Sequence, residues 1–146
     1  MNDFTYFTPT KVIFGKGAEE KTGENIKAFG CKKVLVHYGS GSVIRTGLLD
    51  RIYKSLDDLN IEYVSLGGVV PNPRLSLARE GIELCKKENV DFILAVGGGS
   101  VIDSAKCIGY GATNEGDVWD FYEKKRVPKA CLPIGEFLLL LQQVLK

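Results

Sequence analysis

Histidine is nearly absent from this chain, whose 146 residues include only His37. That scarcity excludes a metal site with several histidine ligands and a Ser-His-Asp protease complete within the chain. His37 stands between Val36 and Tyr38 in a run that is otherwise mostly apolar. We therefore interpret it as a structural residue rather than a catalytic one.

Cysteine is also sparse, and no two cysteines have the C-x-x-C spacing of a metal or redox site. Each lies in an apolar or helical context, where a free cysteine behaves as a small apolar residue. The start of the chain has neither the basic nor the apolar region of a secretory signal. We expect a reducing, cytoplasmic location. The four cysteines are Cys31, Cys85, Cys107 and Cys131.

Neither sign of charge dominates, because 19 Lys and Arg face 18 Asp and Glu and leave a net charge of +1. Such a chain has no field that attracts nucleic acid or anionic lipid, and no apolar stretch approaches the ~20 residues that span a bilayer. We expect neither nucleic acid nor membrane as a partner. The mass of 16.0 kDa fits one globular domain.

The sequence alternates short β-branched runs with longer amphipathic stretches, which is typical of βαβ units. We predict an α/β fold with a Rossmann-like parallel sheet, flanking helices and an N-terminal β-hairpin with arms at 4–7 and 11–14. The other strands are expected at 33–38, 61–66, 91–96 and 130–133. Helices are expected at 18–29, 42–59, 76–89 and 101–112, followed by a turn at 117–122.

Three consecutive glycines, Gly97, Gly98 and Gly99, separate the most apolar predicted strand from a predicted helix. Glycine loses the most backbone freedom on folding, so this run indicates a ligand that needs close access to the backbone. The amide groups and dipole at the start of a helix suit a phosphate. We expect Ser100 to cap the helix, with Asp103 completing an S-x-x-D start. The alternative is a tight turn with a well-capped helix and no ligand.

A second glycine turn, Gly39-Ser40-Gly41-Ser42, also follows a strand and precedes a helix. It is not a complete G-x-G-x-x-G, because Ile44 takes the third glycine's place and the next strand lacks a terminal acidic residue. A rigid Pro71-Asn72-Pro73 connection follows that next strand. Because the carboxyl ends of parallel strands share an edge, a long anionic ligand would contact all three loops.

Two further groups of side chains are candidates for a structural or a functional role. Asp103 and Lys106 lie three residues apart on a predicted helix, where they either form an exposed ion pair or frame the ligand of the glycine loop. Trp119, Phe121 and Tyr122 are most simply interpreted as an aromatic cap on the core.

Together these segments resemble the iron-containing, metal-dependent (group III) alcohol dehydrogenases, and within them the butanol dehydrogenase branch. The resemblance spans about Phe4 to Gly135 and follows the family's order and spacing. Its most specific part is the glycine-Ser-x-x-Asp-x-x-Lys motif of residues 97–106. The other matching stretches are Phe14-Gly15-Lys16-Gly17, Tyr38 to Ser42, Pro71-Asn72-Pro73 and Glu115 to Asp120.

The resemblance implies a dehydroquinate synthase-like N-terminal domain that binds NADP or NAD. In the family, an all-helical domain follows, whose Asp and three His hold a divalent metal, iron or zinc. Asp103 would lie near the nicotinamide ribose and Asn72 near the adenine. The pyrophosphate would be cradled by Gly98, Gly99, Ser100, Val101 and Ile102.

The loop of Gly39, Ser40, Gly41 and Ser42 bears on the choice of cofactor. NAD-preferring relatives carry an Asp in this loop, where the present chain has only small residues. Without that carboxylate, the repulsion against a 2′-phosphate is removed. We therefore expect NADP to be tolerated or preferred.

The activity implied by the resemblance is the interconversion of small aldehydes and primary alcohols. The metal would polarise the carbonyl oxygen while a hydride passes between the nicotinamide and the carbonyl carbon. With one histidine, the chain cannot assemble the family's metal site, so we expect it to bind cofactor with negligible turnover. Two alternatives are a non-catalytic, truncated nucleotide-binding fragment and the cofactor domain of a related glycerol dehydrogenase or dehydroquinate synthase-like enzyme.

We assign residues 1–135 to the NAD(P)-binding domain and 136–146 to an aberrant or truncated tail, with the all-helical metal-binding domain absent. The tail departs from the Thr-rich glycine loop that the family carries there, and a shifted reading frame would explain it. The alternative is a short amphipathic terminal helix. Because apolar faces would be left open, we expect self-association, including a homodimer through the N-terminal hairpin.

Overall fold

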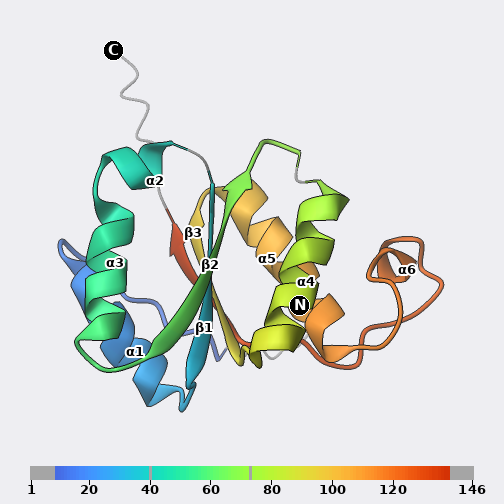
Figure 1. Cartoon of the computed structure of the whole chain (residues 1–146), viewed down its shortest axis with the longest axis horizontal. Coiled ribbons are helices and arrows are strands. Elements are labelled where there is room, and N and C mark those ends of the chain that lie inside the picture. The colour runs from blue at the N-terminus through green and yellow to red at the C-terminus, as the bar shows by residue number, and fades with distance from the viewer. Residues whose placement is uncertain (1–8, 40, 73, 139–146) are drawn as a thin grey trace, which may run out of the picture.

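The computed structural model describes residues 9–39, 41–72 and 74–138, which form a parallel sheet with helices on both faces (Figure 1). The four described strands have the order β2-β1-β3-β4, and every pair is parallel. They are β1 (Lys33–Gly39), β2 (Glu62–Val69), β3 (Phe92–Gly97) and β4 (Ile134–Leu138). The predicted α/β fold with a Rossmann-like parallel sheet is confirmed.

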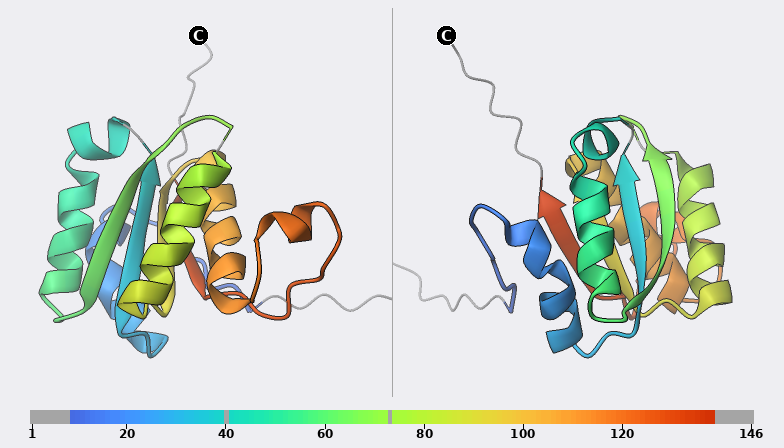
Figure 2. Two further views of the ribbon diagram at one scale, coloured as in Figure 1. Left: turned by 45° about the vertical axis from the view of Figure 1, so that its right-hand side comes forward. Right: turned by 60° about the vertical axis from the view of Figure 1, so that its left-hand side comes forward.

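Helices pack on both faces of the sheet, as Figure 2 shows. One face is covered by α4 (Leu75–Glu88) and α5 (Gly99–Thr113), and the other by α1 (Thr22–Ala28) and α3 (Leu48–Asp57). The shorter elements are the 3₁₀ helix η1 (Ala18–Lys21), α2 (Ser42–Arg45) and α6 (Trp119–Tyr122). Within the described ranges, no helix has the length and hydropathy needed to cross a membrane.

Side chains of the central strands alternate between two apolar cores, because successive residues of a strand point to opposite faces. Val34 and Val36 of β1 pack with residues of α1 and α3. Leu35 lies between them in sequence and packs with residues of α4 and α5. Every residue of β3 is buried, which explains its near-continuous apolar sequence.

The helix predicted at 42–59 is divided into α2 and α3, so the prediction of one continuous helix is wrong. Gly47 separates the two elements and has a φ of 69°, a left-handed conformation that glycine adopts without steric cost. The apolar spacing continues across the break and hides it in the sequence. The predicted stripe is otherwise present, with Leu48, Leu49, Ile52 and Leu56 buried along α3.

The last strand follows residues 130–133 rather than occupying them. Pro133 has no amide hydrogen for the ladder, but its carbonyl accepts the amide of Ile93 at 3.0 Å. Regular pairing then starts with Ile134 opposite Ile93. Of the predicted tail at 136–146, residues 136–138 form the end of β4, and residues 139–146 lie outside the described residues.

The second arm of the predicted N-terminal hairpin is not a strand. Residues 11–14 are irregular, and the first arm at 4–7 lies outside the described residues. Val12 is 82% exposed and Phe14 is 97% exposed, so this segment lacks the apolar packing that a two-stranded hairpin needs. The helix predicted at 18–29 is confirmed as η1 and α1, and a left-handed turn at Gly30 follows it.

Candidate functional site

The parallel strands all end at one edge of the sheet, here called the carboxyl edge. At this edge Gly39 of β1 is paired with Val69 of β2, and Gly97 of β3 is paired with Leu138 of β4. From the central β1 the chain passes outward to β2 and then crosses to β3 on the other side of β1. The loops after β1 and β3 therefore flank the point where the strand order reverses, which is where open α/β sheets bind ligands.

Both the backbone conformation and the close approach of Val101 require a glycine at position 97, at the end of β3. Its φ is 153°, and a Cβ atom at this position would lie 2.7 Å from Cγ2 of Val101. Any larger residue would therefore strain the backbone and collide with the first turn of α5. The buried Val101 side chain fills the space beneath the loop.

Gly98 and Gly99 leave open space above the start of α5. Both are exposed, and a Cβ atom on either would meet no atom within 4 Å. The amides of Val101 and Ile102 donate to the carbonyl of Gly98 at 3.0 and 3.2 Å. The amides of Gly99 and Ser100 belong to the first turn and have no intrahelical acceptor. These two amides are available to an anion at the positive end of a 15-residue helix.

Ser100 does not cap the helix, contrary to the prediction. The N-cap residue is Gly98, which makes no side-chain cap hydrogen bond, and α5 already begins at Gly99. The glycines therefore enter the helix themselves and place Ser100 in its first turn, half-buried. The S-x-x-D spacing of Ser100 and Asp103 consequently does not form the predicted box.

The loop after β1 approaches the same valine. A Cβ atom on Gly39 would lie 3.5 Å from Cγ2 of Val101 and 3.6 Å from the carbonyl oxygen of Val69, which are ordinary contacts. Gly41 has a left-handed φ of 82°, and Ser42 is exposed at the start of α2. Ser40 lies outside the described residues. The tertiary structure thus brings the two glycine loops together over Val101.

Asn72 lies on the third loop and Asp103 on the second turn of α5, and both are exposed. Asn72 has a left-handed φ of 59°. Asp103 and Lys106 form no ion pair with each other; instead both line a pocket of about 360 Å³ between α4, α5 and α6. None of the glycines of the two loops lines this pocket, which is completed by Arg74, Leu75, Ala78, Ser104, Cys107, Tyr110, Trp119 and Tyr122.

His37 is buried in the core, and both of its ring nitrogens are hydrogen-bonded. Nδ1 lies 2.8 Å from the carbonyl oxygen of Leu66, and Nε2 lies 2.8 Å from Oγ of Ser104. Because a carbonyl only accepts, Nδ1 donates to Leu66 and Nε2 accepts from the Ser104 hydroxyl. Burial lowers the pKa of His37 below its ordinary value. The structural interpretation of this residue is confirmed.

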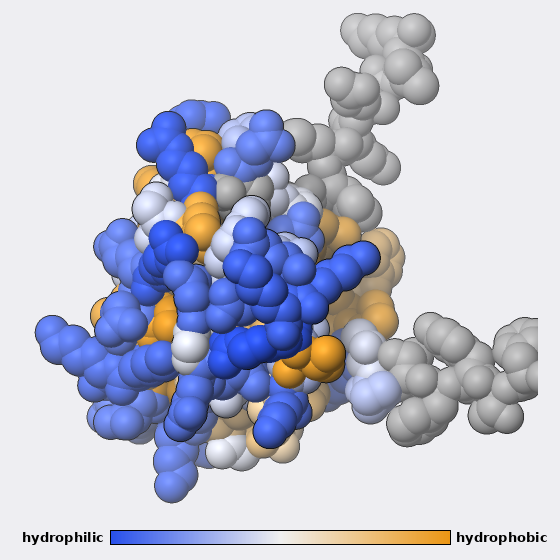
Figure 3. All heavy atoms as spheres, turned by 90° about the vertical axis from the view of Figure 1, so that its right-hand side faces the viewer, coloured by the Kyte–Doolittle hydropathy of each residue, from blue (hydrophilic) through white to orange (hydrophobic). Residues whose placement is uncertain are grey.

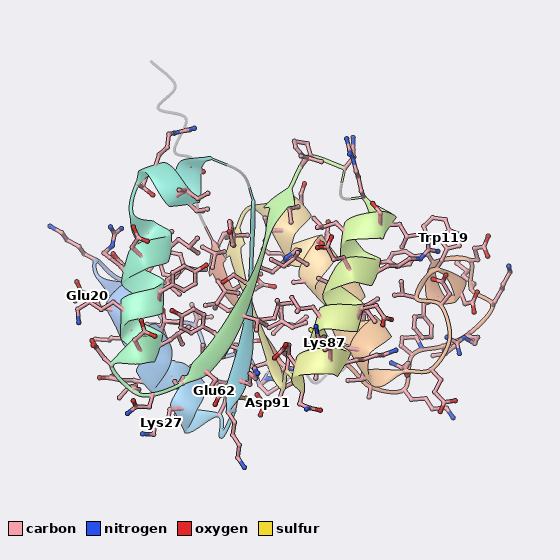
Figure 4. All side chains as sticks on the ribbon, in the orientation of Figure 1. Glu20, Lys27, Glu62, Lys87, Asp91 and Trp119 are labelled. Carbon is pink, nitrogen blue, oxygen red and sulfur yellow. The ribbon has the colours of Figure 1, made fainter. Side chains whose placement is uncertain are left out.

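Polar groups at the opposite, amino edge of the sheet hold the fold together. The carboxylate of Asp91, which is labelled in Figure 4, accepts the backbone amides of Lys32 and Lys33 at 2.9 to 3.1 Å. The ammonium of Lys33 pairs with Glu88 at 2.9 Å and with Glu62 at 3.6 Å. These ion pairs and hydrogen bonds stabilise the amino edge of the sheet.

The aromatic residues and the cysteines singled out in the sequence lie in or near the cores rather than at the carboxyl edge. Phe121 packs against the core, as an aromatic cap would, whereas Trp119 and Tyr122 are exposed and stack with ring centroids 5.8 Å apart. Cys85 and Cys107 are buried and free, and burial raises the pKa of Cys85 to about 12. Throughout the described ranges, no group of three or more His, Cys, Asp or Glu side chains is arranged to hold a metal ion.

Arg45, at the end of α2, lies at the carboxyl edge but is not among the candidate site residues predicted from the sequence. Its guanidinium Nη1 lies 2.9 Å from the position that a Cβ atom on Gly41 would take, so the side chain folds back over the loop. The only signal in the sequence is a basic residue four positions after Gly41. The glycine motif predicts the backbone turn but not the orientation of the Arg45 side chain.

Comparisons with known proteins match nearly the whole chain. The sequence pattern of the family described as iron-containing alcohol dehydrogenase matches residues 9–137. The chain is 49% identical over 140 residues to the probable NADH-dependent butanol dehydrogenase 1 of Bacillus subtilis, covering 96% of this chain and 36% of that protein. It is 37% identical over 144 residues to the NADPH-dependent aldehyde reductase YqhD of Escherichia coli, with the same two coverages of 96% and 36%.

A similar fold is found in the crystal structure of NADH-dependent butanol dehydrogenase A from Thermotoga maritima. The TM-score is 0.91 at 46% identity, over 94% of this chain and 35% of that chain. The chain therefore spans about a third of the length of the relatives that it matches.

Proposed function

This chain belongs to the iron-containing alcohol dehydrogenase family, and from that premise we propose that its carboxyl edge binds the pyrophosphate of a nicotinamide cofactor. The observation that carries the proposal is the open space above Gly98 and Gly99 at the start of the 15-residue helix α5. A phosphate group fits where there is no side chain and where first-turn amides point outward.

The proposed contacts follow from where the residues lie. The amides of Gly99 and Ser100, next to Gly98, bind the pyrophosphate, while Gly97 and Val101 shape the floor of the loop. Ile102 contributes its backbone to the same turn. One nucleoside lies along Gly39, Gly41 and Ser42, Asp103 approaches the nicotinamide ribose, and Asn72 approaches the adenine.

Within a longer protein of this family, we infer that the chain serves an alcohol dehydrogenase that interconverts aldehydes and primary alcohols such as butanol. A bound nicotinamide supplies or accepts the hydride. The residues of this chain hold and orient the cofactor through backbone amides and keep its phosphates against α5. The metal of the family finds no fitting ligand group in the described ranges, so no step through it is assigned to these residues.

Both NADH and NADPH are compatible with the loop after β1. Among its described positions Gly39, Gly41 and Ser42, none carries a carboxylate that would repel a 2′-phosphate. The names of the relatives include an NADH-dependent and an NADPH-dependent enzyme. We further propose that the NAD(P)-binding domain assigned to residues 1–135 extends to Leu138, because β4 pairs with β3 up to that residue. We also propose that the protein works in the cytoplasm.

The test is a fluorescence titration of NADH and NADPH with the purified chain and its Gly99→Ala variant. A methyl group at Gly99 occupies the proposed phosphate position, so we expect binding roughly tenfold weaker, equal to about 1.4 kcal/mol. The fold should not suffer, because the space is open and alanine favours a helix over glycine by about 0.5–1 kcal/mol.

Ala28→Val is the control, because it enlarges the exposed last residue of α1, away from the carboxyl edge, and should leave both affinities unchanged. Equal affinities for Gly99→Ala and the unmodified chain would contradict the proposed phosphate site. An absence of saturable binding to the unmodified chain would overturn the cofactor function itself.

A further inference from the structure

Arg45 is the cation that lies against the glycine loop after β1. It ends α2, its amide donates to the carbonyl of Gly41 at 2.9 Å, and its guanidinium returns over the same residue. Gly41 permits this return because it has no side chain and adopts a left-handed φ of 82°. The charged group therefore lies close to the backbone of the loop while the residue stays exposed to solvent.

The guanidinium of Arg45 has no acidic partner in the described part of the chain. None of the ion pairs found among these residues includes it. Arg51, six residues further on in α3, differs in this respect, because its side chain pairs with Glu19 at 3.1 Å and donates to the carbonyl of Thr46 at 3.1 Å. The donors of the Arg45 guanidinium are therefore available to an anionic ligand.

The position of Arg45 relative to the carboxyl edge selects the kind of group. A dinucleotide with its pyrophosphate at Gly98 and Gly99 crosses from α5 toward the loop after β1, because both loops meet over Val101. In sheets of this type, an acidic residue near the ribose favours a 2′-hydroxyl, whereas a nearby arginine accommodates a 2′-phosphate. A guanidinium also matches a phosphate geometrically, since it donates two parallel hydrogen bonds.

We propose that Arg45 binds the 2′-phosphate of an adenine dinucleotide at the carboxyl edge and thereby sets the preference for the phosphorylated cofactor. This assignment rests on the cofactor function proposed above. Arg45 is thus a specificity-determining residue rather than a catalytic one, because the 2′-phosphate that it contacts is remote from the hydride.

The experiment compares NADPH with NADH, which differ only in the 2′-phosphate, on the full chain and on its Arg45→Ala variant. We expect NADPH binding to weaken roughly tenfold in the variant and NADH binding to change by less than about twofold. Arg45→Lys should fall between, because it retains the charge without the paired donors. Added salt should weaken NADPH binding to the unmodified chain more than to Arg45→Ala.

Lys27→Ala is the control, because Lys27 is also exposed and carries the same charge but lies at the end of α1, away from the carboxyl edge. It should leave the ratio of the two affinities unchanged. An unchanged ratio in Arg45→Ala, or an equal loss for both cofactors, overturns the role of Arg45 while leaving the cofactor function intact. If the unmodified chain binds neither cofactor, both proposals fall.

Discussion

At the scale of single residues, His37 connects three elements through its two ring nitrogens. The ring belongs to β1, donates to the Leu66 carbonyl of β2 and accepts from the Ser104 hydroxyl of α5. The neutral ring satisfies both partners, and burial disfavours its charged form. His37 therefore couples the stability of the fold to pH, because the unfolded chain binds a proton that the folded chain resists.

We predict that the free energy of unfolding decreases as the pH falls below 6.5, the ordinary pKa of histidine. The pKa of His37 is lower in the folded state, so the unfolded state binds more protons in this range, and the loss reaches up to about 1.4 kcal/mol per pH unit. Urea unfolding between about pH 7.5 and 5.5 measures it. The paired carboxylates Glu88 and Asp117 have lowered pKa values and titrate below this window.

His37→Gln removes the titrating group and should give a nearly flat profile in the same window. Ser104→Ala keeps the buried imidazole and should retain the slope, although it lowers the stability at every pH. A slope in His37→Gln as steep as that of the unmodified chain would rule out this histidine as the cause.

At the scale of elements, two glycines allow α4 and α5 to pack closely. A Cβ atom on Gly81 of α4 would collide with the Cδ1 atom of Ile108 on α5, and one on Gly111 of α5 would collide with the Cδ1 atom of Ile82 on α4. Each isoleucine thus occupies the space that the facing glycine leaves free. This close packing sets how near α5 lies to α4.

For the α4–α5 contact, we predict that Gly111→Ala lowers the free energy of unfolding by about 1–3 kcal/mol through overpacking. Ile82→Ala should lower it by about 2–5 kcal/mol through a cavity. Because the new methyl group enters the space that Ile82 vacates, the double variant should lose less than the sum of the two. Urea unfolding checks this, with Gly99→Ala as the control on the same helix. Strict additivity would show that the two side chains do not share one space.

At the scale of the whole molecule, the surface is uneven in polarity. The face over α4, α5 and α6 is mostly hydrophilic, with separate apolar spots (Figure 3). The N-terminal segment, in contrast, exposes Val12 and Phe14 almost fully, at 82% and 97%. Such side chains favour contact with another apolar surface. We therefore predict self-association through these exposed apolar side chains, which does not require a regular hairpin at residues 11–14.

We predict that the purified chain self-associates with increasing concentration and that Phe14→Glu shifts it toward the 16.0 kDa monomer. Burying a phenylalanine stabilises an interface by about 1.5–3 kcal/mol, and a buried carboxylate would oppose it. Light scattering coupled to size-exclusion chromatography measures the change. Trp119→Glu, at the exposed aromatic residue that begins α6, is the control and should leave the mass unchanged. A monomeric unmodified chain at all concentrations would contradict the prediction.

Much of the fold and part of the candidate site follow from the sequence alone. Most of the strands and helices are predicted by local periodicity, and the runs Gly97 to Gly99 and Gly39 to Ser42 stand after buried strands. Because parallel strands place their carboxyl ends at one edge, the sequence predicts that these loops share it. Local signals fail at residues 11–14, which form no strand, and at Gly47, where the apolar spacing continues across the break between two helices. They also place the last strand too early, because β4 begins only after Pro133.

Only the tertiary structure decided which atoms meet. It placed Val101 beneath both glycine loops, brought Ile82 against Gly111, and turned Arg45 back over Gly41. It also made Gly98 the N-cap in place of Ser100. The physical reason is that periodicity reports which face of one element is buried, whereas contacts between distant segments depend on how the faces pack.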